Sequence, residues 1–147
     1  MIRDATNQDI DVILKMASEF WKHTMYTEEF EPEAAMPMLN ISLDQQLVLL
    51  AEVDGNVVGI IAAMEMPLMA SSKATQAIET MWYIDPSCRG SSVGVDLILQ
   101  MEQRIKDRGV KYWNMAKMES SMPETIDRLY SKLGYIESES MYTKIFN

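Results

Sequence analysis

Apolar residues recur every three to four positions in several stretches of the chain, which is the spacing of one face of a helix. The first stretch predicts an amphipathic helix that ends near Lys22, and Thr6 followed three residues later by Asp9 forms a capping box at its start. The same spacing predicts three further helices, at 33–43, 94–108 and 123–133. Pro32 and Pro37 interrupt the pattern of the second helix, because proline removes a helical hydrogen bond.

Apolar runs between these helices predict strands. The expected strands are Met1–Arg3, Gln46–Val53, Val57–Met66, Thr75–Ile84, Lys111–Ala116 and Met141–Phe146. Asp54-Gly55 predicts a two-residue hairpin turn, and Pro67 is expected to end the third strand. The order of elements is neither a strict alternation of strand and helix nor an all-β array. A mixed sheet of the α/β or α+β class is therefore expected.

Length and composition narrow the class of protein. The 147 residues suit one domain, and we expect a single domain over 1–147. The lone Cys88 excludes an internal disulfide, and we find neither a long apolar run nor a basic-then-apolar leader, so a cytoplasmic protein without membrane contact is expected. The net charge of −9 repels nucleic-acid phosphates and favours cationic partners, although an acidic surface also serves solubility alone. We therefore expect no nucleic-acid partner.

The stretch DPSCRGSSVG, Asp85–Gly94, lies between a predicted strand and a predicted helix. Its small residues suit a tight surface turn. They equally suit an anion cradle, because backbone N–H groups at a helix N-terminus have no helical partners and attract phosphate, and Arg89 adds a charged donor. From the residues alone, both interpretations stay open.

Other site chemistries find little support. The loop lacks the lysine and serine of a triphosphate-binding motif and the Gly-x-Gly-x-x-Gly of a dinucleotide-binding motif. A Ser-His-Asp triad would depend on the only histidine, His23. One histidine and one cysteine are too few for a zinc centre, so no metal site is expected.

Two motifs resemble those of the GNAT superfamily of acyl-CoA-dependent N-acetyltransferases. The first is RGSSVG, Arg89–Gly94, within ETMWYIDPSCRGSSVGVDLILQMEQRIKDRGVKYWNM, and the second is LYSKLGY, Leu129–Tyr135. Ser92 stands where the family has its first glycine. The resemblance implies a central, mostly antiparallel mixed sheet of about six to seven strands flanked by about four helices. It also implies acetyl-CoA as co-substrate.

The resemblance assigns residues to the co-substrate. The strand at Trp82, Tyr83 and Ile84 would pair with the pantetheine arm as an added strand does. The pyrophosphate would contact the loop and helix start: Arg89, Gly90, Ser91, Ser92, Val93, Gly94 and Val95.

Two residues are candidates for proton transfer. Glu79 lies in a largely apolar strand, where burial raises the pKa of a carboxyl and suits it to act as a base, although a solvent-facing position is the alternative. Tyr130 matches the family's general-acid tyrosine and would donate a hydrogen bond to the departing thiolate. By periodicity alone, Tyr130 is a core residue of its helix.

The acceptor pocket of relatives forms between the first two helices, where this chain carries Trp21, His23, Tyr26 and Glu28. Aromatic and acidic side chains suit a cationic amine, and a solvated loop with one core tryptophan is the plainer interpretation. The resemblance thus implies direct transfer of an acetyl group from acetyl-CoA to a small-molecule or protein amine. The alternative is a non-catalytic CoA-binding or protein-interaction module on the same fold. Relatives commonly form a homodimer.

Overall fold

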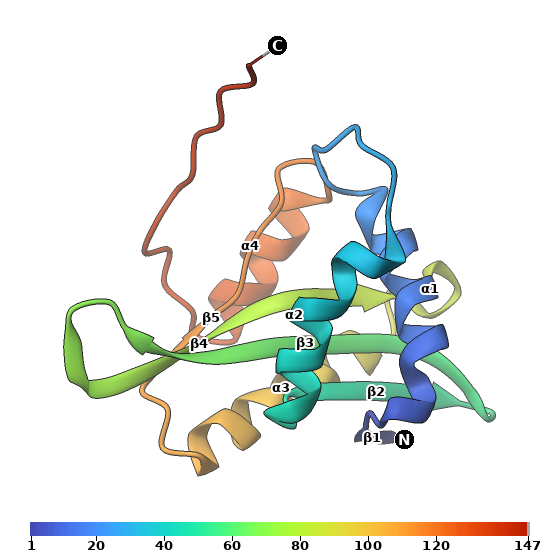
Figure 1. The fold of residues 1–147 in the computed structure, drawn as a ribbon, viewed down its shortest axis with the longest axis horizontal. Helices are drawn as coiled ribbons and strands as arrows, with labels where there is room; N and C mark the ends of the chain where they lie inside the picture. The colour runs from blue at the N-terminus through green and yellow to red at the C-terminus, as the bar shows by residue number, and fades with distance from the viewer. Residues whose placement is uncertain (147) are drawn as a thin grey trace. The chain divides into compact units, whose positions relative to one another are not determined.

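The structure is a computed structural model that describes residues 1–146. Its contacts divide the chain into two compact units, Met1–Ala116 and a shorter unit that begins at Lys117. The first unit holds five strands and three α-helices in the order β1 (Ile2–Asp4), α1 (Ile10–Trp21), α2 (Pro32–Asp44), β2 (Val48–Val53), β3 (Asn56–Leu68), β4 (Ser71–Ile84), α3 (Val93–Asp107) and β5 (Tyr112–Asn114) (Figure 1). The second holds α4 (Pro123–Lys132). Among the described residues, no helix combines the length and apolarity needed to cross a membrane.

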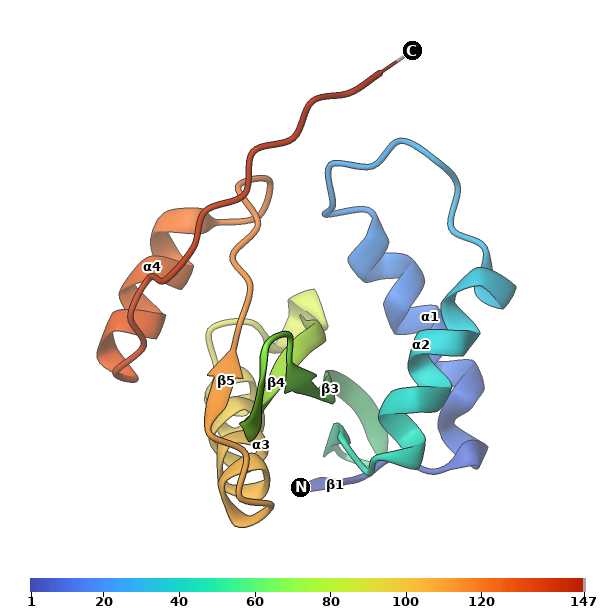
Figure 2. The ribbon, with the colours of Figure 1, turned by 60° about the vertical axis from the view of Figure 1, so that its left-hand side comes forward.

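The five strands form one sheet in the order β1-β2-β3-β4-β5. Every neighbouring pair is antiparallel except β4 and β5, which are parallel. Helices α1 and α2 cover one face of the sheet and α3 covers the other (Figure 2). This mixed, mostly antiparallel α/β architecture confirms the expected fold class.

Each face of the sheet buries its own apolar layer. Under α1 and α2, Ile13, Met16 and Leu39 pack against inward-facing residues of β2, β3 and β4: Val48, Leu50, Ile60, Ala62, Met81 and Tyr83. On the other face, α3 buries Leu97, Ile98, Met101 and Ile105. Gly59 permits the close approach there, since a Cβ at this position would lie 2.8 Å from Ile84 Cδ1 and 3.1 Å from Leu97 Cδ1.

The predicted capping box is present before α1. Thr6 donates its backbone N–H to Asp9 at 2.8 Å, and a short 3₁₀ turn, Asn7–Asp9, leads into the helix. The Arg3 guanidinium donates to both oxygens of Asp9, at 2.9 and 2.8 Å, and to Glu52 at 2.9 Å. This ion pair lowers the pKa of the Asp9 carboxyl from 3.8 to about 2 and ties β1 to the start of α1.

The hairpin turn at Asp54-Gly55 is also confirmed. Asp54 and Gly55 have positive φ angles of 50° and 78°, and Val53 pairs with Asn56 across the turn. Positive φ at both central residues is the geometry that matches the twist of a two-residue hairpin, which explains the Asp-Gly sequence.

Two of the three prolines that were expected to interrupt elements lie inside them, and the third, Pro32, is the first residue of α2. Pro37 is within α2, and Pro67 is within β3 and pairs with Thr75. The ladder between β2 and β3 ends at Val48 and Ala62, so β3 beyond Ala62 has no strand neighbour on that side. A proline on such an edge sacrifices no ladder hydrogen bond. Strand β4 begins at Ser71, four residues before the expected start at Thr75.

A side chain replaces the missing strand beside β3. The Gln45 amide donates to Glu65 O at 3.0 Å and accepts from Glu65 N at 2.8 Å, so it satisfies both backbone groups of Glu65.

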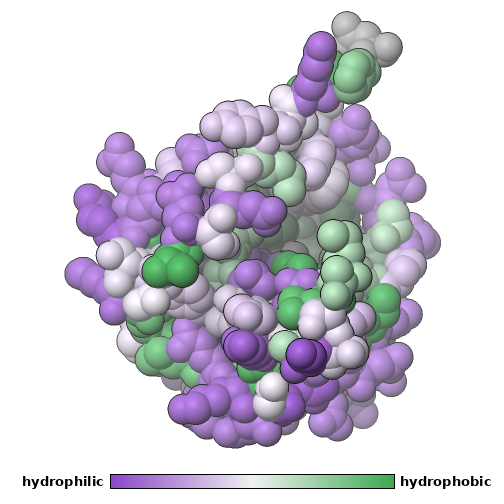
Figure 3. Space-filling view, turned by 90° about the vertical axis from the view of Figure 1, so that its left-hand side faces the viewer, coloured by the Kyte–Doolittle hydropathy of each residue, from purple (hydrophilic) through white to green (hydrophobic). Residues whose placement is uncertain are grey.

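The end of the β3–β4 hairpin extends beyond the other strands of the sheet (Figure 1). The face that Figure 3 shows is mostly hydrophilic, with scattered apolar side chains.

The expected strand at Met141–Phe146 is wrong, as is the count of six to seven strands. Residues 135–146 form no strand, and Met141 and Tyr142 are 93% and 95% exposed. An extended segment becomes a strand only when a neighbour accepts and donates its backbone hydrogen bonds. The alternation of apolar residues therefore indicates a preference for extended backbone, but no neighbouring strand among the described residues pairs with this segment.

Candidate active site

A β-bulge in β4 separates two halves of the strand. Ala62 of β3 pairs with Met81, while its neighbour Ala63 pairs with Glu79, so Thr80 is an extra residue on β4. Directly opposed residues share a face of the sheet. Met81 therefore points with Ala62 into the α1–α2 layer, and Glu79 points with Ala63 to the face that α3 covers.

The same half of β4 has an open edge. Parallel pairing with β5 covers only Gln76, Ala77 and Ile78. Within the described chain, β4 continues to Ile84 without a strand on that side. Unpaired backbone groups along a strand edge can bind another extended chain.

Glu79 lies where this edge opens. Its carboxylate accepts one hydrogen bond, from the backbone N–H of Ala116 just after β5, at 3.1 Å. The Glu79 side chain is half-buried, and desolvation by the surrounding protein raises its pKa from 4.5 to about 7, against the smaller lowering effect of the Ala116 donor. A carboxyl with a pKa near neutrality exchanges protons readily at physiological pH.

The segment after β4 is a compact loop built from its own polar groups. The Asp85 carboxylate accepts from Ser87 N at 2.9 Å and so caps a 3₁₀ turn, Pro86–Cys88. Gly90 follows with a φ angle of +84°, which favours glycine. The loop delivers the chain to the N-terminus of α3.

Ser92 precedes the first residue of α3. Its φ and ψ angles of −71° and −15° are ordinary for any L-residue, so this position requires no glycine. Its hydroxyl donates to Asp96 Oδ2 at 2.7 Å, within its own helix. Gly94 is different, because a Cβ there would lie 3.1 Å from Trp82 Cζ2. The free N–H groups at the start of α3 form the positive end of the helix dipole, which attracts anions.

Arg89 folds back onto the end of β4. Its Nε donates to Ile84 O at 3.0 Å, and its guanidinium lies 5.5 Å from the centroid of the Tyr83 ring. The His23 ring lies on the same tyrosine, with centroids 6.5 Å apart. The Tyr83 ring therefore lies near both His23, from the segment after α1, and Arg89, from the loop after β4.

Trp82 carries an orphan donor. Its indole Nε1 is buried and has no hydrogen-bond partner among the described residues. A buried N–H without an acceptor costs free energy, so such a group marks a position where an acceptor is missing.

Three of the four residues expected to shape an acceptor pocket, Trp21, Tyr26 and Glu28, contact one another. Trp21 and Tyr26 stack with centroids 5.2 Å apart and an interplanar angle of 18°. The Trp21 indole donates to Glu28 O at 2.7 Å. These contacts hold the segment between α1 and α2 in a defined conformation, and the Glu28 side chain is exposed.

Tyr130 lies in α4, in the unit that begins at Lys117. Its ring meets that of Tyr135 at 5.2 Å and 39°. Its role as a proton donor stays a prediction.

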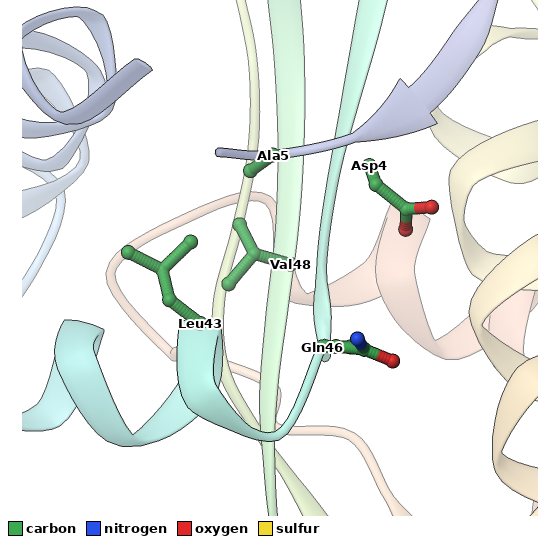
Figure 4. A pocket seen from close by; sticks show the side chains of 5 residues that line it. All are labelled: Asp4, Ala5, Leu43, Gln46 and Val48. Carbon is green, nitrogen blue, oxygen red and sulfur yellow. The ribbon is translucent and has the colours of Figure 1, made fainter. Parts of the chain in front are cut away.

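A shallow pocket at the opposite end of the sheet offers no comparable chemistry. It is lined by Asp4, Ala5, Leu43, Gln46 and Val48 (Figure 4). The carboxylate of Asp4 is paired with Arg104, which also donates to Gln46 O at 2.9 Å. Its one charged lining residue is thus already neutralised.

Sequence reasoning missed the Ala116 backbone donor and the bulge at Thr80. The donor belongs to the main chain and has no residue signature. The two-residue alternation of β4 changes phase at Thr80, and this change is the one signal that marks a bulge.

The comparisons agree with this geometry. The model of the acetyltransferase (GNAT) family matches residues 10–135. Among solved structures, the chain is similar to a transcriptional regulator from Bacillus halodurans C-125, with 20% identity, a TM-score of 0.77 and 99% of each chain covered. It is similar to a ribosomal-protein-alanine N-acetyltransferase from Brucella melitensis biovar Abortus 2308, with 18% identity, a TM-score of 0.74 and 99% of each chain covered.

A third structure is a predicted acetyltransferase with acetyl-CoA from Clostridium acetobutylicum, at 14% identity and a TM-score of 0.77, covering 99% of this chain and 95% of that one. No curated protein matches the sequence. At these identities the solved structures show a shared fold, while the family model covers most of the chain. The chain therefore belongs to the GNAT family of acetyltransferases.

Proposed function

We propose that this protein transfers an acetyl group from acetyl-CoA directly to a primary amine of a small molecule or a protein. The single observation that carries the proposal is the half-buried Glu79 carboxyl, with a pKa of about 7, beside the open edge of β4. Family membership supplies the reaction class, and this carboxyl supplies a group able to perform its proton transfer.

The loop and the strand edge suit CoA. The N-terminus of α3 offers backbone N–H groups for the pyrophosphate, and the exposed Gly90 leaves the backbone of the loop accessible. Trp82–Ile84 would pair with the pantetheine arm as a strand does. The residues proposed to contact CoA are Trp82, Tyr83, Ile84, Arg89, Gly90, Ser91, Ser92, Val93, Gly94 and Val95. The fold-back of Arg89 assigns its guanidinium to shaping the loop, and leaves the backbone of the loop to meet the pyrophosphate.

Glu79 would accept the proton that an ammonium must lose before its nitrogen attacks the thioester. An amine is nucleophilic only when deprotonated, and a base with a pKa near the working pH is best matched to this transfer. The N–H of Ala116 orients the carboxylate. Tyr130 would donate a hydrogen bond to the sulfur as the thiolate leaves. Trp21, Tyr26 and Glu28 would line the acceptor side.

Binding of acetyl-CoA tests the proposal first. At 100 times its dissociation constant, a ligand adds about 2.7 kcal/mol of stability, which raises the melting temperature of a chain of this size by roughly 5–10 °C. ADP at the same concentration serves as the anion control. No shift with acetyl-CoA or CoA would contradict the proposal, and a shift without turnover over a panel of amines would indicate a non-catalytic CoA-binding module instead.

A further inference from the structure

The excess negative charge of the chain is concentrated in one segment. Residues 23–72 contain no Lys or Arg and eight acidic residues, so they account for −8 of the net charge of −9. The eight are Glu28, Glu29, Glu31, Glu33, Asp44, Glu52, Asp54 and Glu65. Acidic and basic residues are almost balanced in the rest of the chain.

Most of these carboxylates have no cation beside them. Glu52 pairs with Arg3 and Glu65 pairs with Arg108. Within residues 1–146, no ion pair is formed by five exposed carboxylates of α2 and the loop before it: Glu28, Glu29, Glu31, Glu33 and Asp44. Uncompensated like charges repel one another and attract a cationic partner.

The outward face of α2 is apolar. Its exposed residues Ala34, Pro37, Met38 and Ile41 are three to four positions apart, so they share one face of the helix. Met38 and Ile41 remain 50% and 48% exposed. The opposite face supplies Leu39 and Met36 to the core. Helix α2 is thus apolar on both sides, and Figure 1 shows that it lies in front of the sheet, beside α1.

The acidic loop that leads into this helix is held in place and reaches the candidate active site. The Trp21–Tyr26 stack and the bond from Trp21 to Glu28 O fix its course. At its other end, His23 contacts Tyr83 of β4. A chain bound along α2 and this loop is therefore led to the end of β4.

We propose that the outward face of α2 and the loop before it form a docking surface for a basic segment of a protein acceptor, rich in Lys and Arg and carrying apolar side chains. The apolar stripe binds the apolar side chains, and the five carboxylates bind the cations. A second copy of this chain fits poorly, because a two-fold interface would place these carboxylates against their own counterparts. The inference rests on the proposed function only in that the docked protein is the acetyl acceptor.

Docking is measured without CoA. The probe is a fluorescent peptide in which Leu recurs every three to four positions between Lys and Arg residues, and binding is followed by anisotropy. One control peptide has Glu in place of the basic residues, and a second keeps the charge but has Ser in place of Leu. We expect only the first peptide to bind, and to bind about tenfold more weakly as NaCl rises from about 50 to about 300 mM.

Matched variants locate the surface. Met38→Ser with Ile41→Ser is expected to weaken binding about tenfold, and Glu31→Gln with Glu33→Gln about threefold. The control variants Met69→Ser, at a fully exposed hairpin tip, and Glu139→Gln should leave binding unchanged. Unchanged melting temperatures establish that each variant is folded, and a single substitution, Ile41→Ser or Met38→Ser, replaces a double variant that is not.

Several results would overturn the inference. Equal binding to the α2 variants and the controls would place the peptide elsewhere. Equal binding of the Ser-containing peptide would show that charge alone acts. A dimer in sedimentation that Ile41→Ser dissociates would make a second copy the occupant.

Turnover separates this inference from the proposed function. With the basic peptide as acceptor, the α2 variants should raise KM with little change in kcat. Failure of the wild-type protein to bind acetyl-CoA would contradict the proposed function and leave the anisotropy result standing. Peptide binding that is unchanged in the α2 variants would contradict the docking surface and would leave the result on acetyl-CoA binding unaffected.

Discussion

Asp9 and Glu79 are both partly buried carboxyls of the first unit, and their pKa values move in opposite directions. Two hydrogen bonds from the Arg3 guanidinium lower the pKa of Asp9 to about 2. Among the described residues, Glu79 has no cationic partner and a single backbone donor, Ala116, and desolvation raises its pKa to about 7. At neutral pH, Asp9 is a fixed charge, whereas Glu79 gains and loses a proton.

The difference separates a structural group from a chemical one. The ion pair with Arg3 offsets the desolvation free energy of Asp9 and joins β1 to the start of α1. The Ala116 donor offsets only part of the desolvation of Glu79, and groups with strongly shifted pKa values cluster where a protein needs proton transfer. Each prediction below removes one side of this contrast.

The largest effect is expected for Glu79→Gln. The amide keeps the shape of the side chain but accepts no proton, and general-base catalysis contributes about 10²–10⁴-fold to a rate. We therefore expect kcat to fall by at least about 100-fold, with acetyl-CoA binding retained, as measured by release of free CoA thiol.

The pH profile sharpens this prediction. Glu79 must be deprotonated to act, so kcat/KM should fall about tenfold per pH unit below about 7 and level off above it. In Glu79→Gln this limb should vanish, while any limb due to the acceptor ammonium remains. A kcat unchanged in the variant would remove Glu79 from its proposed role.

A smaller effect, on stability alone, is expected for Asp9→Asn. The change leaves Arg3 with Glu52 as its remaining carboxylate partner and should cost about 1–3 kcal/mol, because both side chains of the pair are partly exposed. Denaturant unfolding at pH 7 measures the loss, and kcat should be unchanged.

The sign with pH follows from the lowered pKa of Asp9. Its contribution is fully present above about pH 4 and is lost as the pH falls toward 2. The wild-type and variant stabilities should therefore converge in acid. A difference that persists at pH 2 would assign it to packing instead of the ion pair.

The smallest effect is expected for Ser42→Ala. The Ser42 hydroxyl in α2 is buried without a hydrogen-bond partner among the described residues. Its desolvation, like that of Glu79, is not offset by a cation, but the hydroxyl does not titrate. Its removal should stabilise the fold by about 0.5–1 kcal/mol and leave kcat unchanged. Thr6→Ala, which deletes a cap, should destabilise by about 1 kcal/mol and serves as the contrasting variant. A loss of stability in Ser42→Ala would mean that the hydroxyl finds a partner.

Local rules predicted much of this fold. The capping box at Thr6 and the Asp54-Gly55 hairpin depend on a few neighbouring residues, and both formed as expected. Pro37 and Pro67 were judged by the same rules, which fail where an edge position or tertiary packing tolerates a proline. Met141–Phe146 failed for the complementary reason, because a strand needs a partner that its own residues do not specify.

The candidate site divides in the same way. Glu79 and the loop at 85–94 were found because a carboxyl in an apolar strand and small residues before a helix are readable in the sequence. Desolvation raises the pKa of Glu79, as expected for a carboxyl in an apolar strand, and its role as a base stays a prediction. The Ala116 donor, the orphan Trp82 indole and the fold-back of Arg89 depend on distances between segments far apart in the chain, and no local pattern encodes them.

The extra residue at Thr80 also governs how this chain is compared with its relatives. The extra residue shifts the register of β4, so Glu79 and Met81 point to opposite sides of the sheet. The number of residues in the strand causes this, and the type of residue at position 80 does not. An alignment that runs through β4 without a gap against an unbulged strand would match the carboxyl to a residue of the wrong side. Loss of Thr80 would exchange the inward and outward sets of one half of the strand, whereas its replacement would leave that order intact.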